Sequence, residues 1–309
     1  MAIAETQLYM PPAPRSRQRL LEDERWLAML LLVPTVVLLG LFIAYPFVRG
    51  IILSVTDSRV GVPGDFVGLA NFHKIWNDSI FRTSVYNTFV YTGVTTIFKL
   101  ALGLWLAMLL NRNFRGKAFT RAFILLPFII PTVLSTFAWK WMFDPTFSVL
   151  NWLLFHLNLI TGRINWMGDP DLAMISIIIV NIWRGVPFFA ISLLAGLQTI
   201  SPELNEAAAI DGAKPWARFW YITWPLLLPV TMVVVLFSVI QTFADFQIVY
   251  VMTGGGPANA THLFATYAYQ IGVGTGLLSE GAAVSLAIFP VLLLVVIIQL
   301  LYIRKVETV

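Results

Sequence analysis

Six apolar runs, each long enough to cross a bilayer as a helix, restrict most strongly how this 309-residue chain can fold. A spanning α-helix needs about 20 consecutive apolar residues, because the hydrocarbon core is about 30 Å thick. Charged residues make up only 12% of the chain, against about 25% in soluble domains. The sequence therefore predicts an all-α, polytopic bundle of six transmembrane helices. The predicted spans are residues 27–48, 85–110, 122–142, 172–197, 225–246 and 282–303.

Basic residues are distributed unevenly over the segments that join these spans. If the N-terminus lies inside, the inner segments hold twelve Lys and Arg residues and the outer segments hold five. Cytoplasmic loops carry such an excess, so both termini and the loop 198–223 are predicted to be cytoplasmic. The twelve are Arg15, Arg17, Arg19, Arg25, Arg112, Arg115, Lys117, Arg121, Lys214, Arg218, Arg304 and Lys305, and the five are Arg49, Arg59, Lys74, Arg82 and Arg163.

The same orientation divides the chain into inner and outer parts. The first apolar run is too long for a signal-peptide core, so we interpret it as a retained span. The net charge of +4 is attributed to the basic residues on the inner side, so membrane lipid, and not nucleic acid, is the expected partner. The predicted parts are a cytoplasmic segment 1–26, a first span 27–48, an extracytoplasmic segment 49–84, the main bundle 85–303 and a cytoplasmic tail 304–309.

The sequence offers little for catalysis. It has no cysteine, and His73, His156 and His262 lack the spacing of metal ligands. The segment 116–118 lacks the upstream glycine and the hydroxyl residue of a nucleotide-binding loop, and no GxSxG nucleophile motif occurs. We therefore expect that this chain is not an enzyme and that it binds no cofactor or metal itself.

A polar segment, residues 201–229, interrupts the apolar pattern between the fourth and fifth spans. Ser201 and Pro202 are residue types that begin a helix, and Gly212 can take the left-handed conformation that ends one. One face of this predicted helix is small and largely apolar, which suits a groove in another protein. That face carries Leu204, Ala207, Ala208 and Asp211.

Within this segment, residue types and spacing resemble the EAA loop of ATP-binding-cassette importer permeases. The matching residues are Glu206, Ala207, Ala208, Gly212, Ile222 and Pro225. Trp224 stands where that family has leucine, so packing at the start of the next span is expected to differ. The resemblance implies a type I importer permease fold over residues 85–303, with a coupling loop at about 198–224. It also implies that a nucleotide-binding subunit is contacted by Glu206, Ala207, Ala208, Asp211 and Gly212.

The third outer loop contains Thr253, three glycines and Pro257, which favour a tight turn over a helix. A phosphate-binding loop is not indicated, because the following Lys-Ser/Thr is missing. With Phe243, Asp245 and Phe246 before it, this loop is similar to that of maltose-type carbohydrate permeases. The chain resembles the first member of the permease pair that such importers contain.

The second outer loop allows two interpretations. The tryptophan-rich segment 139–143, together with Asn151, is similar to the corresponding loop of sugar-importer permeases. The alternative needs no such likeness, because tryptophans gather at membrane interfaces and Lys140 can extend to the lipid headgroups.

These resemblances imply a multi-component importer in the bacterial cytoplasmic, or inner, membrane. The implied partners are a second homologous permease subunit, two nucleotide-binding ATPase subunits and an extracytoplasmic solute-binding protein. ATP and Mg would be bound by the ATPase subunits. The implied function is import of a mono-, di- or oligosaccharide, driven as ATP binding closes the ATPase pair and moves the coupling helix.

Lys99, Arg184 and Asp245 lie deep within predicted spans, where a central charge costs about 2.5–3.5 kcal/mol. Arg184 precedes Gly185 and Pro187, which we expect to break or kink the fourth span and so to form a solute site. The alternative is a structural pair of Arg184 with an acid or a backbone carbonyl. Lys99 is interpreted as structural.

A substrate pathway is predicted from the polar residues near Arg184. Gln241 and Asp245 are one helical turn apart, so we expect them to share a face. A sugar offers hydroxyl groups to polar side chains and a ring face to aromatic ones. Trp183 and Phe188 can supply such rings, with packing in the bundle as the alternative role. The predicted pathway residues are Asn181, Trp183, Arg184, Gln241 and Asp245.

Three alternative functions stay open at this stage. A permease of the same class could carry a non-sugar solute such as a polyamine or a phosphodiester. A secondary transporter or channel would need no ATPase and no docking helix. A membrane enzyme would need a catalytic cluster at the membrane interface, and the sequence contains none.

Overall fold

The computed structural model describes residues 24–307, and every regular element in that part is a helix. The chain divides into two compact units, residues 1–52 and 53–309. In the first unit, α2 (Glu24–Leu39), η1 (Gly40–Ala44) and α3 (Tyr45–Ser54) continue one another, with the last residues of α3 in the second unit. The run Trp26–Ser54 is apolar enough to cross a membrane, as predicted for 27–48. The basic residues predicted at 15–19 lie outside the described residues.

The second unit contains the remaining predicted spans, with longer bounds than the sequence indicates. They are α5 (Ser79–Asn111), α9 (Pro170–Gln198), the run Pro215–Met252 and the run Leu278–Tyr302. Asp78 begins α5 by accepting a hydrogen bond from the Ile80 backbone N–H at 2.8 Å. Among the described residues, five helical runs qualify as spans, or six if one bent pair of helices is counted as a span.

Shorter helices subdivide or connect these spans. The fifth run consists of α11 (Pro215–Arg218), η2 (Phe219–Thr223), α12 (Trp224–Phe243) and α13 (Gln247–Met252), and the sixth of α15 (Leu278–Ala287) and α16 (Phe289–Glu307). The connecting helices are α4 (Ala70–Asn77), α8 (Val149–His156), α10 (Pro202–Ile210), α14 (Phe264–Tyr269) and η3 (Gln270–Gly274).

The third predicted span, 122–142, is not one straight helix. It consists of α6 (Lys117–Ile129) and α7 (Thr132–Met142), which meet at an angle of 89°. Pro131 explains the break, because proline cannot donate a backbone hydrogen bond and pushes the preceding residue out of the helical conformation. Ile130 is accordingly extended, with φ −63° and ψ 133°.

The central contact of the second unit joins α5 and α9. At Gly103 on α5 the backbones approach so closely that an added Cβ would overlap Phe189 on α9. Small residues permit such close approach between membrane helices. Ala107, Leu193 and Leu227 are fully buried beside this contact and bring α12 into the same core.

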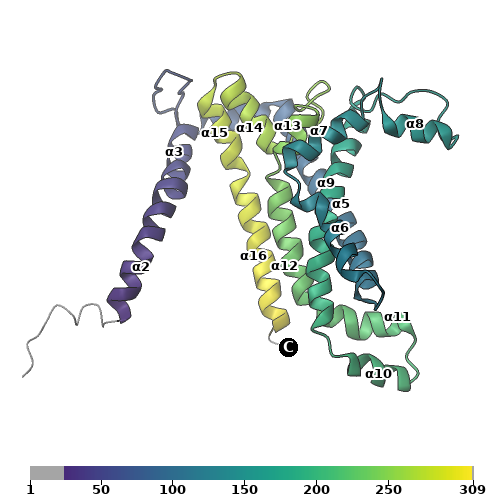
Figure 1. Cartoon of the computed structure of the whole chain (residues 1–309). Helices are drawn as coiled ribbons and strands as arrows, with labels where there is room; N and C mark the ends of the chain where they lie inside the picture. The colour runs from purple at the N-terminus through teal and green to yellow at the C-terminus, as the bar shows by residue number, and fades with distance from the viewer. Residues whose placement is uncertain (1–23, 308–309) are drawn as a thin grey trace, which may run out of the picture. The chain divides into compact units, whose positions relative to one another are not determined.

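Within the second unit, the connecting elements gather at opposite ends of the bundle (Figure 1). Helices α10 and α11 and the C-terminal end of α16 lie at one end. Helices α7, α8, α13, α14 and α15 lie at the other. The arrangement agrees with the predicted separation of the polar segment 201–229 from the glycine-rich loop.

Candidate functional site

A cavity of about 490 Å³ is lined by α5, α9 and α12 together with the bend between α6 and α7. This volume falls within the range of about 300–1,000 Å³ that is usual for small-molecule sites. Four of the five predicted pathway residues line it, namely Asn181, Arg184, Gln241 and Asp245. Trp183 is not among the lining residues and lies edge-on against Trp139, with ring centroids 5.5 Å apart. The alternative role of Trp183, packing, is therefore the one that the structure favours.

Asp245 lies at a break in the fifth span and not on a continuous helix. Helix α12 ends at Phe243 and α13 begins at Gln247, so the expected shared helical face of Gln241 and Asp245 is wrong. Both residues reach the cavity because the chain turns between the two helices. Asp245 Oδ1 accepts a hydrogen bond from the Ile248 backbone N–H at 3.3 Å, in the first turn of α13.

The other carboxylate oxygen of Asp245 joins two further helices. Its Oδ2 accepts hydrogen bonds from the Tyr91 hydroxyl on α5 at 2.7 Å and from Asn181 Nδ2 on α9 at 3.0 Å. Tyr91 is fully buried. One carboxylate therefore connects three spans at the wall of the cavity, and all of its hydrogen-bond donors in the described chain are neutral.

Lys99 also lines the cavity, a role that its sequence context did not reveal. Its side chain is only 3% exposed, and Nζ donates to the Thr242 hydroxyl on α12 at 2.8 Å. A lone lysine in an apolar run carries no pattern that predicts which way it faces. The sequence-based interpretation of Lys99 as structural agrees with its hydrogen bond to α12, but it did not include a position at the cavity wall.

The predicted break of the fourth span at Gly185 and Pro187 is wrong. Helix α9 runs without interruption from Pro170 to Gln198. An added Cβ at Gly185 would overlap the stem of Lys99, so this glycine makes room for the lysine. The broken helices near the cavity are instead the α6–α7 pair and the α12–α13 junction.

Arg184 has no acidic partner in the described part of the chain. Among the described residues, no carboxylate oxygen lies within 4 Å of the Arg184 guanidinium. The ion pair found in this part of the chain joins Lys74 and Glu280, at 2.6 Å. Arg184 Nε is buried without a hydrogen-bond partner, and so is Asn181 Oδ1. Two residues of the cavity lining therefore each keep one buried polar atom that the described chain leaves without a hydrogen bond.

Aromatic rings form another side of the cavity. Phe128 and Phe188 stack with centroids 5.8 Å apart and planes at 21°, and Phe237 lies 5.2 Å from Phe188. All three line the cavity. Polar and aromatic surfaces thus face one space, as the hydroxyl groups and ring face of a sugar require.

The glycine-rich outer loop is held rigidly next to α5. Asn87 Nδ2 donates to the carbonyl oxygens of Ala260 at 2.7 Å and His262 at 3.1 Å. Gly255 has φ +92°, and a Cβ there would overlap the His262 imidazole. His262 is 1% exposed, and this burial lowers its pKa. These contacts brace the loop against α5.

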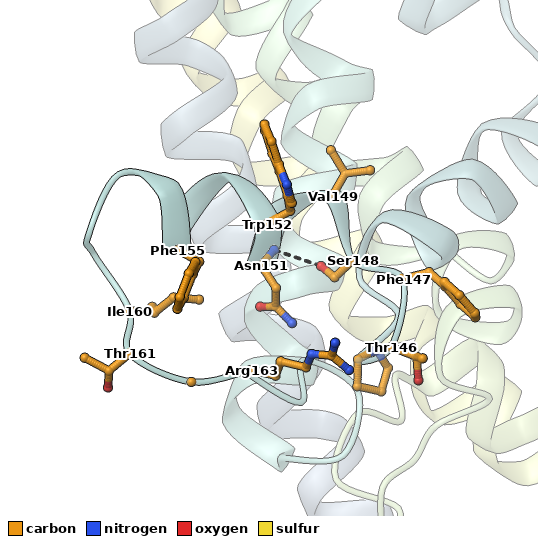
Figure 2. Close-up of a pocket in the computed structure, with 12 residues that line it drawn as sticks. Thr146, Phe147, Ser148, Val149, Asn151, Trp152, Phe155, Ile160, Thr161 and Arg163 are labelled. Carbon is orange, nitrogen blue, oxygen red and sulfur yellow. Dashed lines mark hydrogen bonds between the residues drawn. The ribbon is translucent and has the colours of Figure 1, made fainter.

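A second hollow, of about 700 Å³, surrounds α8 in the second outer loop (Figure 2). Figure 2 shows Phe155 of α8 beside Ile160, and none of the residues that line this hollow also lines the cavity of Arg184. Asn151 braces this loop, because its Nδ2 donates to the Ile164 carbonyl and its Oδ1 accepts from Trp166 Nε1, both at 2.9 Å. Lys140 Nζ donates to the Val251 carbonyl at 2.9 Å.

The predicted helix in the polar segment is α10. Ser201 Oγ accepts a hydrogen bond from the Glu203 backbone N–H at 3.3 Å, Pro202 is the first helical residue, and Gly212 follows the helix with φ +82°. No residue of α10 is buried, and Ile210 is 88% exposed. Arg218 Nη1 donates to the Asn205 carbonyl at 3.4 Å and so joins α10 to the end of α11. The segment therefore presents an ordered helix outside the bundle.

Comparison with known proteins identifies the family. Residues 99–307 match the family described as the binding-protein-dependent transport system inner membrane component. This chain belongs to that family. It is therefore a transport permease subunit of the inner membrane, as the EAA loop indicated, and the match includes α9, α10, α12 and the part of α5 that follows from Lys99.

Two permease proteins of named transport systems match nearly the whole chain. The trehalose/maltose transport system permease protein MalF of Thermococcus litoralis is 34% identical over 278 residues, which are 90% of this chain and 93% of that protein. The sulfoquinovosyl glycerol transport system permease protein SmoG of Agrobacterium fabrum is 36% identical over 293 residues, or 94% of each chain.

A solved structure confirms the permease fold. A bacterial ABC transporter involved in the import of the acidic polysaccharide alginate contains a chain that superposes with a TM-score of 0.80. The match covers 93% of this permease and 99% of that chain, at 22% sequence identity. The all-α bundle of a type I importer permease is thus the fold of this chain.

Proposed function

We propose that this permease subunit imports a carbohydrate through the cavity between α5, α9 and α12. The observation that carries the proposal is the lining of that cavity, where the polar residues Arg184 and Asn181 share one space with the rings of Phe128 and Phe188. The sugar-transport names of the two relatives support the same substrate class. The side chains proposed to line the pathway are Asn181, Arg184, Gln241 and Asp245, joined by Lys99.

The driving force would come from partner subunits. The exposed helix α10 fits a groove on a nucleotide-binding subunit, with Glu206, Ala207, Ala208, Asp211 and Gly212 as its contact residues. Two such subunits would bind ATP and Mg, and their closure would move α10 and α11 together. The hydrogen bond from Arg218 to the Asn205 carbonyl supports such joint motion, because it ties the coupling helix to the helix that continues into α12.

The remaining partners follow from the family and from the two ends of the bundle. A second permease subunit would complete the pathway, and an extracytoplasmic binding protein would deliver the solute to the outer loops. One solved relative, the alginate transporter, is in complex with a pentasaccharide-bound periplasmic protein. In the proposed orientation, α10, α11 and both chain termini are cytoplasmic, because the inner segments carry the excess of Lys and Arg.

The test is uptake by the complete importer in proteoliposomes. Sugar uptake should require ATP inside, the binding protein outside and both permease subunits. Ala substitution of Arg184 or Asp245, made singly, should lower both uptake and solute-stimulated ATP hydrolysis. Normal values for both variants would remove these residues from the pathway. Solute movement by this chain alone, without an ATPase, would favour a secondary transporter instead.

A further inference from the structure

The cavity of Arg184 contains more positive than negative charge. Its charged lining residues are Lys99, Arg184 and Asp245, two cations and one anion. A buried charge without a counter-ion is strongly destabilising, and charged residues at membrane depth are functional by default. The excess positive charge therefore calls for an explanation.

Asp245 does not neutralise either cation by direct contact. Its Oδ2 is occupied by the neutral donors Tyr91 and Asn181, and its Oδ1 by the backbone N–H of Ile248. No ion pair within 4 Å joins it to Lys99 or Arg184 in the described chain. The carboxylate serves to hold three helices together.

Both cations keep hydrogen-bond donors free. The Thr242 hydroxyl accepts a hydrogen bond from one of the three N–H groups of Lys99. Within the described residues, no acceptor binds any of the five N–H groups of the Arg184 guanidinium. Close packing keeps Lys99 in place, because its stem lies against Gly185, one residue from Arg184. The helix contact therefore holds the lysine at the same cavity as the arginine.

We propose that this cavity selects an anionic saccharide, one that bears a carboxylate or sulfonate group, and that Arg184 and Lys99 are its charge-selecting residues. The inference rests on the proposed carbohydrate function and narrows its substrate class. The planar guanidinium of Arg184 suits two-point hydrogen bonding to a planar carboxylate, and the point charge of Lys99 supplements it. The phenylalanine surfaces remain available for the sugar ring.

The experiment uses the complete importer with its own binding protein. The binding protein is first tested for thermal stabilisation by glucose, glucuronate, 6-deoxy-6-sulfoglucose, maltose and the corresponding disaccharide uronate. Uptake of the recognised sugar is then measured for Arg184→Gln, Arg184→Lys and Lys99→Met. Arg163→Gln is the control, because it removes an exposed arginine from the second outer loop.

We expect an acidic sugar to be recognised and its uptake at limiting concentration to fall about tenfold or more in Arg184→Gln, which corresponds to about 1.4 kcal/mol. Arg184→Lys, which keeps the charge, should retain much more uptake than Arg184→Gln, and Arg163→Gln should match the unmodified protein. The amount of assembled complex is measured for each variant, so that a folding defect in Lys99→Met is recognised.

Two results would overturn the charge selection and leave the carbohydrate function intact. One is uptake of neutral sugars only. The other is equal loss of uptake in Arg184→Gln and Arg184→Lys, which would show that the arginine serves structure, for example by pairing with an acid of the second permease subunit. If no saccharide of either charge is taken up, the proposed function fails as well.

Discussion

The side-chain stem of Lys99 on α5 packs directly against Gly185 on α9. A Cβ at position 185 would overlap the lysine Cδ, so glycine is what lets the stem lie between the two helices. The ammonium group then reaches Thr242 on α12, with Nζ and Oγ1 2.8 Å apart. Two residues far apart in the sequence thus form one wall of the cavity.

This contact predicts that Gly185→Ala will destabilise the protein. The added methyl group must displace the Lys99 stem, and overpacking of a core costs about 1–3 kcal/mol. The thermal unfolding of the purified importer should shift to lower temperature. Combining Gly185→Ala with Lys99→Ala should cost less than the sum of the single changes, because the second substitution removes the atoms that clash.

Gly93 provides a matched control on α5. Outside its own turn of helix, no atom lies within 4 Å of a Cβ built there, so Gly93→Ala should be neutral or stabilise the helix by about 0.5–1 kcal/mol. Equal effects of Gly93→Ala and Gly185→Ala on thermal unfolding would contradict the tight contact.

The carboxylate of Asp245 is predicted to be more important than any single donor that it binds. In Asp245→Asn, the new amide N–H₂ must face either the Ile248 backbone N–H or the donors of Tyr91 and Asn181 together. A buried donor left unsatisfied costs about 1–3 kcal/mol, whereas Tyr91→Phe removes one hydrogen bond and should cost about 1 kcal/mol. Thermal unfolding of the assembled importer measures both. A smaller loss for Asp245→Asn than for Tyr91→Phe would refute the connecting role.

The coupling loop is predicted to transmit motion and not to hold the bundle together. Gly212 has φ +82°, a conformation that proline cannot adopt, and Glu206 lies on the exposed helix α10. Gly212→Pro and Glu206→Lys should therefore leave the protein in the membrane but abolish uptake. For each variant, the amount of protein in the membrane, its binding to the ATPase subunit and sugar uptake are measured.

Gly116→Pro tests whether that effect is specific to the loop. Gly116 has φ +83° before α6, so proline creates the same backbone conflict outside the coupling loop. Uptake per inserted molecule should stay higher in Gly116→Pro than in Gly212→Pro. Normal transport by the Gly212→Pro or Glu206→Lys protein would show that the loop does not couple the two processes.

The outer loop is predicted to lose stability in acid. Burial lowers the pKa of His262 in the folded protein, whereas an unfolded histidine titrates at about 6.5. Below that pH, His262 takes up a proton in the unfolded loop but stays neutral in the folded loop. The free energy of unfolding of the loop, which is at its full value above pH 6.5, therefore decreases as the pH falls. Protease resistance of the loop should decrease between pH 7.5 and pH 5.5.

Substitution of His262 separates its contribution from other titrating groups. His262→Gln should reduce the pH dependence of protease resistance, and the exposed His156 serves as the control through His156→Gln. An unchanged pH profile in His262→Gln would assign the effect to another group.

Local sequence signals predicted the spans and the coupling helix well. Hydropathy over about 20 residues locates a membrane helix because the bilayer thickness sets its length. The start of α10 at Ser201 and its end before Gly212 depend on residues within one or two turns. Neither prediction required knowledge of what packs against the helix.

Helix breaks were predicted less well, because proline and glycine act according to their surroundings. Pro131 bends the third span by 89°, whereas Pro187 lies inside a continuous α9. Gly185, expected to weaken that helix, instead accommodates Lys99. A residue type alone does not reveal whether the helix continues through that residue in the folded protein.

By itself, then, the sequence determined the class of protein, the positions of its spans and the exposed helix that marks its family. The tertiary structure decided which side chains share one cavity. It placed Lys99 there, directed Trp183 against Trp139 and turned Asp245 inward at the end of α12. The physical reason is that the rotation and packing of α5, α9 and α12 against one another decide which side chains line the cavity. The hydropathy of a single helix does not predict that packing.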